Sequence, residues 1–328
     1  MAADTSSRVN SSNDLYEYLL GLSDGTITRR ATHFPDKISP TTTDPNQPGL
    51  VVLSRDVTIN GAKNTWARIF LPREALDSSS KIPIIVYYHG GGFVLGSAAG
   101  SMFHDFCSEI ASQFPAAVVS VEYRLAPEHR LPAAYDDAVE ALHWIKTKQD
   151  GLLNEYADLN RCWIMGSSAG GNIAYHAGLR AAAQVDDLMP LKIRGLILQQ
   201  AYFGGSQRTE SELLLVNDPL LPPVLNDLMW DMSLPIGANR DHEYCNPTVG
   251  DDGKKLWDKV GLLGWKVLVI GCNGDPLIDR QISLVEMLKG KGVQVEHQFD
   301  EGGFHGSTMI EPSKTKVLHV LKNFCLSL

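Results

Sequence analysis

A serine that stands between glycines is the clearest sign of chemistry in this sequence. It lies in Gly166-Ser167-Ser168-Ala169-Gly170, which fits the pattern G-x-S-x-G. That pattern carries a nucleophilic serine when it joins a strand to a helix. Here an apolar run at 162–165 precedes it and a helical stretch at 169–183 follows it. Glycines allow the tight turn because they have no Cβ to clash. Only Ser168 is centred between the glycines, so we predict Ser168 as the nucleophile.

A second glycine-rich loop, His89-Gly90-Gly91-Gly92-Phe93, follows the apolar run 82–88. A loop of this kind supplies backbone N–H groups to enzymes that attack acyl groups. We expect the N–H groups of Gly91 and Gly92, with that of Ala169, to bind the negative oxygen of a tetrahedral intermediate. His89 precedes the serine in the chain, so we expect it to orient the loop and not to act as the base.

The acid should come next in the chain, because enzymes with this serine turn run in the order serine, aspartate or glutamate, histidine. Two aspartates follow the apolar run 267–270. Asp275 lies in the loop beyond that run. Asp279 lies where the next helix is expected to begin, a place typical of a helix N-cap. We therefore favour Asp275 as the acid and interpret Asp279 as a cap.

Three histidines follow Asp275 and are candidates for the base: His297, His305 and His319. His297 falls inside an expected strand, and His319 falls inside the expected last helix. His305 lies on the loop Gly302-Gly303-Phe304-His305-Gly306, after a strand and before that helix. We predict that His305 accepts the proton of Ser168 and that Asp275 fixes the tautomer of its ring.

The elements that must position these residues can be read from apolar runs. Two half-alternating runs, at 51–59 and 66–71, are expected to pair antiparallel at one edge of a sheet. Further strands are expected at 82–88, 116–121, 162–165, 196–199, 267–270 and 293–299. Helices are expected at 103–113, 133–148, 169–183, 280–291 and 314–326. Short apolar strands that alternate with helices predict an α/β fold with a mostly parallel, doubly wound sheet.

Residues 205–235 interrupt that alternation. They carry apolar residues at helical spacing, with prolines at 219, 222 and 223 between them. We interpret this segment as a helical insertion that forms a cap over the sheet; an ordinary crossover helix on the surface is the alternative. A cap would close a pocket, and we expect Phe93, Val94, Tyr202 and Trp230 to contact the substrate there.

Composition limits the function classes. The chain has 328 residues, of which 44% are hydrophobic and 20% charged, and a formal net charge of −9. This acidic balance argues against nucleic acid or an anionic membrane as a partner. The five cysteines are scattered and odd in number, so neither a disulfide framework nor a metal site is expected. No secretory signal or membrane-spanning run is present, and we expect a cytoplasmic monomer or weak homo-oligomer that needs no cofactor.

The motifs together resemble one known family. HGGGF, the stretch Tyr123–Asp137, GSSAGGN, GDPLIDR and GGFH are similar to the motifs of plant carboxylesterases of the hormone-sensitive-lipase group, in the same order over about 14–326. The resemblance implies an α/β-hydrolase fold, hydrolysis of small carboxylic esters, and a triad of Ser168, Asp275 and His305. It also implies one domain, 1–328, whose cap combines about 1–34 with 205–235. Within 1–34, the spacing of Leu15, Tyr16, Leu19 and Leu20 predicts a short amphipathic helix at 14–22.

Two positions depart from the family pattern. Such esterases usually carry aspartate or glutamate where Ser167 stands, and Gln200-Ala201-Tyr202-Phe203 replaces a common Gln-Pro-Phe-Phe. Relatives also include gibberellin receptors, which lack the catalytic histidine, and lyases or cyclases that reuse the site. The presence of His305 disfavours a receptor. Our reading is a hydrolase of small acyl esters, acetyl above all, on a plant metabolite or xenobiotic, with a lyase or cyclase as the alternative.

Overall fold

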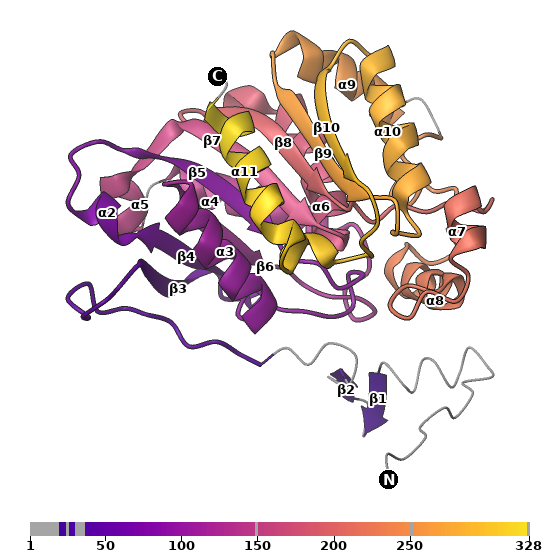
Figure 1. Ribbon diagram of the computed structural model, residues 1–328, viewed down its shortest axis with the longest axis horizontal. Coiled ribbons are helices and arrows are strands. Elements are labelled where there is room, and N and C mark those ends of the chain that lie inside the picture. The colour runs from indigo at the N-terminus through magenta and orange to yellow at the C-terminus, as the bar shows by residue number, and fades with distance from the viewer. Residues whose placement is uncertain (1–19, 24–25, 30–36, 148–149, 250–251, 327–328) are drawn as a thin grey trace.

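A mixed sheet of eight strands forms the centre of the protein (Figure 1). The computed structural model describes residues 20–23, 26–29, 37–147, 150–249 and 252–326. The strands run in the order β10-β9-β8-β7-β5-β6-β4-β3. Their bounds are β3 Val52–Asn60, β4 Thr65–Pro72, β5 Ile82–Tyr88, β6 Ala117–Glu122, β7 Ala157–Ser167, β8 Ile193–Gln199, β9 Lys266–Cys272 and β10 Gln294–Asp300. β4 pairs antiparallel with β3 and β6, and the other neighbours pair parallel.

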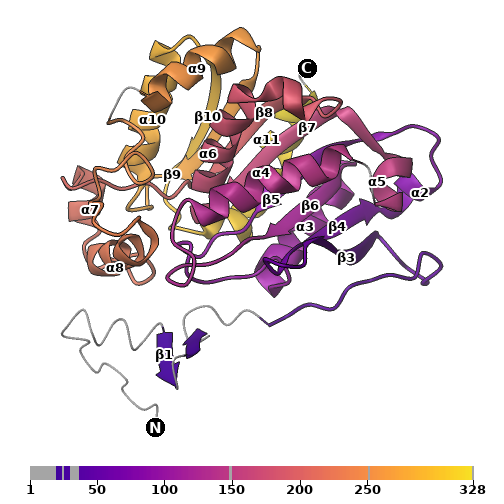
Figure 2. The ribbon, with the colours of Figure 1, turned by 180° about the vertical axis from the view of Figure 1, so that it is seen from behind.

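Helices cover both faces of this sheet, which explains why its strands are apolar on both sides. One face carries α4 (Ala133–Lys146), α6 (Ala169–Ala183), α9 (Asp252–Leu262) and α10 (Ile278–Gly290). The other carries α3 (Ser101–Gln113) and α11 (Ser313–Leu326). Figure 1 shows α3 and α11 in front of the sheet, and Figure 2 shows α4 and α6 on the opposite side. The short helices are α2 (Arg73–Leu76), α5 (Gly151–Tyr156), η1 (Val185–Leu188) and η2 (Ser307–Met309).

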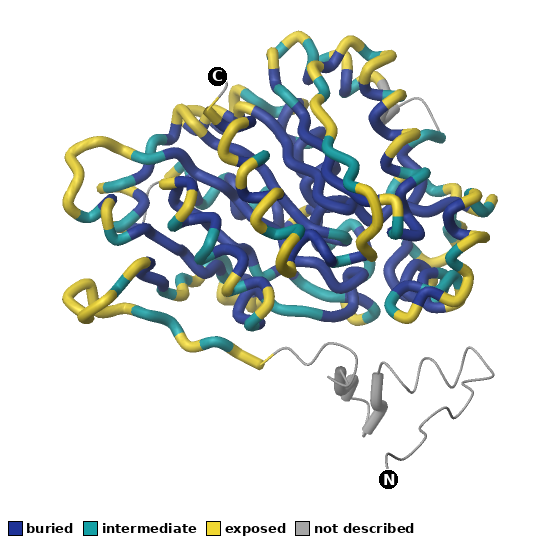
Figure 3. Tube along the Cα trace, in the orientation of Figure 1, coloured by how far each residue is buried: buried dark blue, intermediate teal, exposed yellow. Residues whose placement is uncertain are grey.

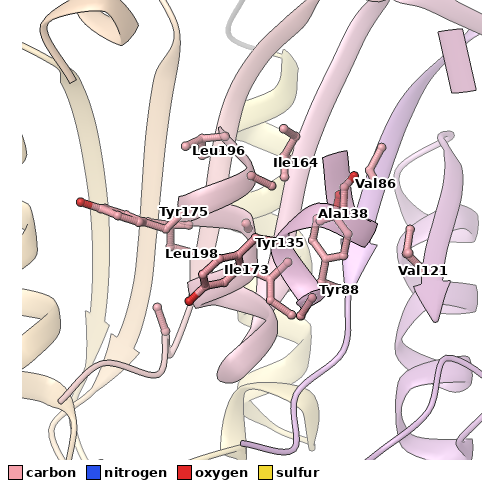
Figure 4. Close-up of a cluster of buried hydrophobic side chains, with 14 of the residues drawn as sticks. Val86, Tyr88, Val121, Tyr135, Ala138, Ile164, Ile173, Tyr175, Leu196 and Leu198 are labelled. Atoms are coloured by element: carbon pink, nitrogen blue, oxygen red, sulfur yellow. The ribbon is translucent and has the colours of Figure 1, made fainter. Parts of the chain in front are cut away.

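β5 shows how the sheet builds two cores. Side chains alternate along a strand, so Ile84, Val86 and Tyr88 join the core under α4 and α6. Ile85 and Tyr87 join the core under α3 and α11. Figure 4 shows the first core, in which Val86 and Tyr88 lie with residues of α4 and α6. Figure 3 shows the strands as a buried centre enclosed by helices whose outer surfaces are exposed.

The predicted strands and helices of the α/β core are confirmed, with ends that differ by a few residues. α5 and α9 were not predicted. The predicted helix at 14–22 lies outside the described residues except at its end, and there the prediction is wrong. Leu20–Ser23 is strand β1, which pairs antiparallel with β2, Thr26–Arg29. Backbone pairing such as Leu22 with Ile27 replaces the helical bonds, and Gly21 within the strand is a poor helix former.

The insertion at 205–235 holds two helices, α7 (Glu210–Leu214) and α8 (Pro223–Ser233). α7 begins with a capping box between Thr209 and Glu212, and α8 begins with a proline, which suits the first helical turn. Figure 1 shows α7 and α8 together, outside the helical layers that cover the sheet. No helix in the described part of the chain is long and apolar enough to span a membrane.

Candidate active site

The predicted site residues come together at the carboxyl edge of the sheet. His89 directly follows β5, Ser168 follows β7, Asp275 follows β9 by a short loop, and His305 follows β10. Parallel strands bring all their carboxyl ends to the same edge, where α/β proteins bind ligands in a crevice. Residues separated by more than 200 positions in the sequence can therefore share one site.

Ser168 sits on a strained turn between β7 and α6. Its φ is 55° and its ψ is −120°, a conformation that non-glycine residues rarely adopt. The neighbours must be glycine for lack of space. A Cβ on Gly166 would lie 2.0 Å from the carbonyl oxygen of Gly170, and a Cβ on Gly170 would lie 1.9 Å from that of Tyr88. The surrounding backbone thus holds the serine in a conformation that costs free energy, as is frequent at functional sites.

Ser168, His305 and Asp275 form a continuous hydrogen-bonded chain. Nε2 of His305 lies 2.8 Å from Oγ of Ser168, and Nδ1 of His305 lies 3.0 Å from Oδ2 of Asp275. Asp275 is fully buried and His305 is buried. Since a carboxylate can only accept, Nδ1–H donates to Asp275, which leaves Nε2 as the acceptor for the hydroxyl of Ser168. This is the arrangement needed to remove the serine proton.

The pKa of His305 reflects two opposed influences. Burial disfavours the charged ring, but the charge of Asp275, its hydrogen bond to Nδ1 and the charge of Asp218 outweigh burial, so the pKa of His305 is raised above its ordinary value. Asp218 belongs to the turn before α8, where its Oδ1 accepts the N–H groups of Leu220 and Leu221. The insertion therefore contributes to the electrostatics of the base.

The glycine loop after β5 lies beside the serine. Gly91 and Gly92 adopt φ values of +117° and +61°, which favour glycine. A Cβ on Gly91 would lie 2.1 Å from the carbonyl oxygen of Leu95, and a Cβ on Gly92 would lie 2.3 Å from Sδ of Met229. Ala169 is the first residue of α6, so its N–H belongs to the amides that a helix leaves unpaired at its N-terminus.

His89 holds this loop through a hydrogen bond and a ring contact. Its Nδ1 lies 2.8 Å from the carbonyl oxygen of Gly90, and its ring stacks on Tyr123 with centroids 4.3 Å apart. The Tyr123 hydroxyl donates to the carbonyl of His89 at 2.8 Å. Burial lowers the pKa of His89 to about 4, so the ring is neutral at physiological pH. These contacts agree with the expectation that His89 orients the loop.

Asp279, the alternative to Asp275 as the acid, is not part of the hydrogen-bonded chain. The interpretation of Asp279 as an N-cap is wrong. The N-cap of α10 is Leu277, and Asp279 is the second residue of the helix. The helix starts earlier because the N–H of Ile278 donates to the carbonyl of Asp275 at 3.0 Å. Oδ2 of Asp279 instead accepts the N–H of Ser211 at 2.8 Å, which connects α7 to the first turn of α10. His297 and His319 are exposed, on β10 and α11.

A cavity of about 300 Å³ opens beside Ser168 and His305. Its walls come from three parts of the chain in addition to the catalytic loops: the start of α3, the insertion and the segment around η2. These wall residues are Ser101, Met102, Phe103, Asp105, Leu220, Leu221, Leu225, Met229, Thr308, Met309 and Ile310. The walls at α3 and η2 were not predicted, because no motif marks a residue that reaches the site only through tertiary packing.

Of the four residues predicted to contact the substrate, only Tyr202 lines this cavity among the described residues. The prediction for Phe93, Val94 and Trp230 is wrong, since these core residues are not among those that line the cavity. Phe93 packs 5.4 Å from Trp230, and Trp230 stacks on Tyr202 with centroids 4.8 Å apart. Phe93 and Trp230 therefore support the wall that Tyr202 presents and do not themselves form it.

Ser167, the first departure from the family pattern, also lines the cavity. The hydroxyl of Tyr87 donates to Oγ of Ser167 at 2.9 Å. Burial keeps the pKa of Tyr87 well above its ordinary value, so Tyr87 remains a donor. The side chain next to the nucleophile is thus uncharged and already hydrogen-bonded. Within the described residues, no group of three or more histidine, cysteine or acidic side chains could hold a metal ion.

Comparison with known proteins agrees with this fold. The sequence model for the α/β-hydrolase fold matches residues 85–309. The chain is 51% identical to carboxylesterase 20 of Arabidopsis thaliana over 96% of this chain and 97% of that protein. It is 47% identical to a 3-O-acetylpapaveroxine carboxylesterase of Papaver somniferum, over 93% and 97%. An esterase of Pyrobaculum calidifontis has a similar structure, with a TM-score of 0.69, 27% identity and 86% of each chain covered.

Proposed function

Because this chain belongs to the plant carboxylesterases of the α/β-hydrolase family and is a serine carboxylesterase, we propose that it hydrolyses compact esters, acetyl esters above all. Its catalytic residues are Ser168, His305 and Asp275. The single observation that carries these roles is the buried hydrogen-bonded chain, with 2.8 Å from Ser168 to His305 and 3.0 Å from His305 to Asp275.

Hydrolysis proceeds through an acyl-enzyme. As Oγ of Ser168 bonds to the ester carbonyl carbon, its proton passes to Nε2 of His305, and the N–H groups of Gly91, Gly92 and Ala169 stabilise the oxyanion. His305 then protonates the departing alcohol as the C–O bond breaks. A water molecule next loses its proton to His305, attacks the acyl carbon and releases the acid, and the proton returns to Ser168.

Cavity size supports the preference for compact substrates. About 300 Å³ is at the small end of the range for ligand pockets, and the insertion closes one side through Leu220, Leu225 and Met229. The relative in Papaver somniferum is named for an acetyl ester, which supports acetyl as the acyl group. A plant metabolite or xenobiotic would supply the alcohol part.

A panel of p-nitrophenyl esters tests this proposal. All members share the leaving group, so kcat/KM compares only the acyl chains. We expect acetate and butyrate to be cleaved at least about tenfold faster than palmitate, because a long chain extends beyond the cavity. A preference for palmitate would contradict the proposal and indicate a lipase-like enzyme.

We also propose a cytoplasmic location. All five cysteines are unpaired and buried, which suits a compartment that keeps thiols reduced. A fluorescent fusion at the C-terminus should distribute with a cytoplasmic marker in plant cells, and enrichment in a secretory compartment would contradict this.

A further inference from the structure

Gln200 has a buried side chain at the active site. Neither the sequence motifs nor the proposed mechanism gives this residue a role. It directly follows β8 and is 2% exposed. Its φ is 44°, in a region that non-glycine residues rarely adopt. Ser168 has the same property at the same edge of the sheet. Strain of this kind persists only where the surrounding structure holds it in place, and it is frequent at functional sites.

The backbone of Gln200 turns toward the next strands. Its N–H donates to the carbonyl of Ile270 in β9 at 2.7 Å. Its side chain reaches the loops that follow β9 and β10, which carry Asp275 and His305. One residue after β8 therefore contacts the loops of both the acid and the base.

The amide group of Gln200 uses all of its hydrogen-bonding capacity. Nε2 donates to Oδ2 of Asp275 at 2.9 Å and to the carbonyl of Phe304 at 3.0 Å, and Sγ of Cys272 lies 3.5 Å from it. Oε1 accepts the N–H of Gly306 at 2.9 Å and the hydroxyl of Thr308 at 2.6 Å. A primary amide has two N–H donors and an oxygen with two lone pairs, so no capacity remains. Acceptors face its nitrogen and donors face its oxygen, which fixes the orientation of the amide.

The partners of this amide surround the base and its acid. Phe304 and Gly306 are the two neighbours of His305 in the chain, so the amide holds the backbone on both sides of the histidine. Oδ2 of Asp275 is also the oxygen that receives Nδ1–H of His305. We propose that Gln200 is a positioning residue that sets the distance and orientation between Asp275 and His305. This inference rests on the proposed catalytic roles of those two residues.

Two other buried glutamines nearby show that burial alone does not create this arrangement. Gln199 donates to the hydroxyl of Thr308 at 2.8 Å, and its Oε1 has no hydrogen-bond partner among the described residues. Gln281 reaches Oδ2 of Asp275 only at 3.4 Å, and its Oε1 likewise has no such partner. Gln199 is thus a matched control, adjacent to Gln200 and equally enclosed, but without a contact to Asp275 or to the neighbours of His305.

The test compares Gln200→Met, Gln200→Glu and Gln199→Met with the wild-type enzyme. Active sites are counted with a fluorophosphonate, and kcat and KM for p-nitrophenyl acetate are expressed per reactive site over a range of pH. Gln200→Met keeps a similar length but removes every hydrogen bond of the amide. We expect kcat to fall about 10- to 100-fold with KM within about twofold, because a small displacement of a catalytic group has effects of this size. Gln199→Met should stay within about twofold in both constants.

Gln200→Glu supplies a readout that loss of packing would not change. Asp275 and Asp218 already favour the protonated form of His305. A further carboxyl group beside Asp275 would favour that form more strongly. The acid limb of kcat/KM should therefore move to higher pH, by about half a unit or more. This variant decides the question if Gln200→Met does not fold.

An unchanged acid limb in Gln200→Glu, or kcat per reactive site within about twofold of wild type in a folded Gln200→Met, would overturn the inference. Either result would make Gln200 a packing residue. Failure of the proposed function is seen separately, because the wild-type enzyme itself would then not react with one fluorophosphonate per chain.

Discussion

The active site has two regions whose conformations are held in different ways. The first is the glycine loop after β5, here called the oxyanion loop, together with the turn at Ser168; the second is the walls of the cavity. The first region is fixed by its backbone: φ is positive at Ser168 and Gly91, and carbonyl oxygens leave no room for a Cβ at Gly170. The second is built from side chains that three distant segments contribute, such as Met102 on α3 and Met229 on α8. Backbone constraints leave little freedom for change, whereas apolar walls can be repacked. We therefore expect changes in the first region to affect all esters alike and changes in the second to alter substrate preference.

Among changes that leave Ser168 in place, Gly91→Ala should give the largest effect on the first region. The added Cβ would lie 2.1 Å from a backbone oxygen of Leu95. The loop must therefore move, and its N–H groups no longer point at the oxyanion. Loss of oxyanion donors lowers kcat by about 10²–10³-fold, and we expect the same factor for acetate and butyrate esters. The measurement is kcat/KM for each ester.

Gly237→Ala is the matched control for that variant. Gly237 also has a positive φ, of 85°, but a Cβ there meets nothing within 4 Å. The Gly237→Ala variant has the same type of backbone strain without a clash, and position 237 lies outside the site. Activity should therefore stay within about twofold of wild type. Equal losses in the two variants would mean that general strain, and not the oxyanion loop, lowers activity.

Met229→Ala should alter preference more than rate. Met229 lines the cavity on α8, and its truncation makes room for a longer acyl chain. A methylene in an apolar pocket changes specificity by about 10-fold or more; because a truncated wall relaxes in part, we expect the hexanoate-to-acetate ratio of kcat/KM to rise about three- to tenfold. Met232→Ala removes a buried methionine from the same helix that is absent from the cavity wall, and its ratio should not change. Equal ratios in both variants would remove the insertion from the substrate wall.

The smallest effect is expected from Asp218→Asn, a change in the insertion that alters the pH dependence of activity through His305. Asp218 belongs to the insertion and, with Asp275, raises the pKa of His305. His305 must be neutral to accept a proton, so activity falls as the pH drops through its pKa, and the raised pKa places this midpoint above that of an ordinary histidine. Asp218→Asn keeps an oxygen for the N–H groups of Leu220 and Leu221 but removes the charge. The acid limb should shift to lower pH by a few tenths of a unit.

Asp231→Asn controls for the loss of one negative charge on the same insertion, since Asp231 is exposed on α8 and does not line the cavity. Its acid limb should coincide with that of the wild-type enzyme. A shift as large as that of Asp218→Asn would attribute the effect to overall charge and not to the neighbourhood of His305.

The same difference explains what could be predicted from the sequence. Ser168, Asp275 and His305 can be predicted as a triad because local rules restrict them: glycines permit the turn, and each residue follows an apolar strand. The structure brings these three together. Phe93 and Trp230 were misplaced because the direction of a side chain depends on packing that no motif records. No motif predicts the proposed role of Gln200, since that role depends on two loops more than 70 residues further along the chain.

The central claim is that Ser168 forms the acyl-enzyme, and mass spectrometry of the intact and digested protein tests it most directly. After brief reaction with a fluorophosphonate, the account predicts one adduct per chain, on Ser168. Ser168→Ala should carry none and should lose at least about 10⁴-fold in kcat, with a melting temperature close to that of the wild-type enzyme. An adduct on Ser167, or full ester hydrolysis by the folded Ser168→Ala protein, would contradict the account.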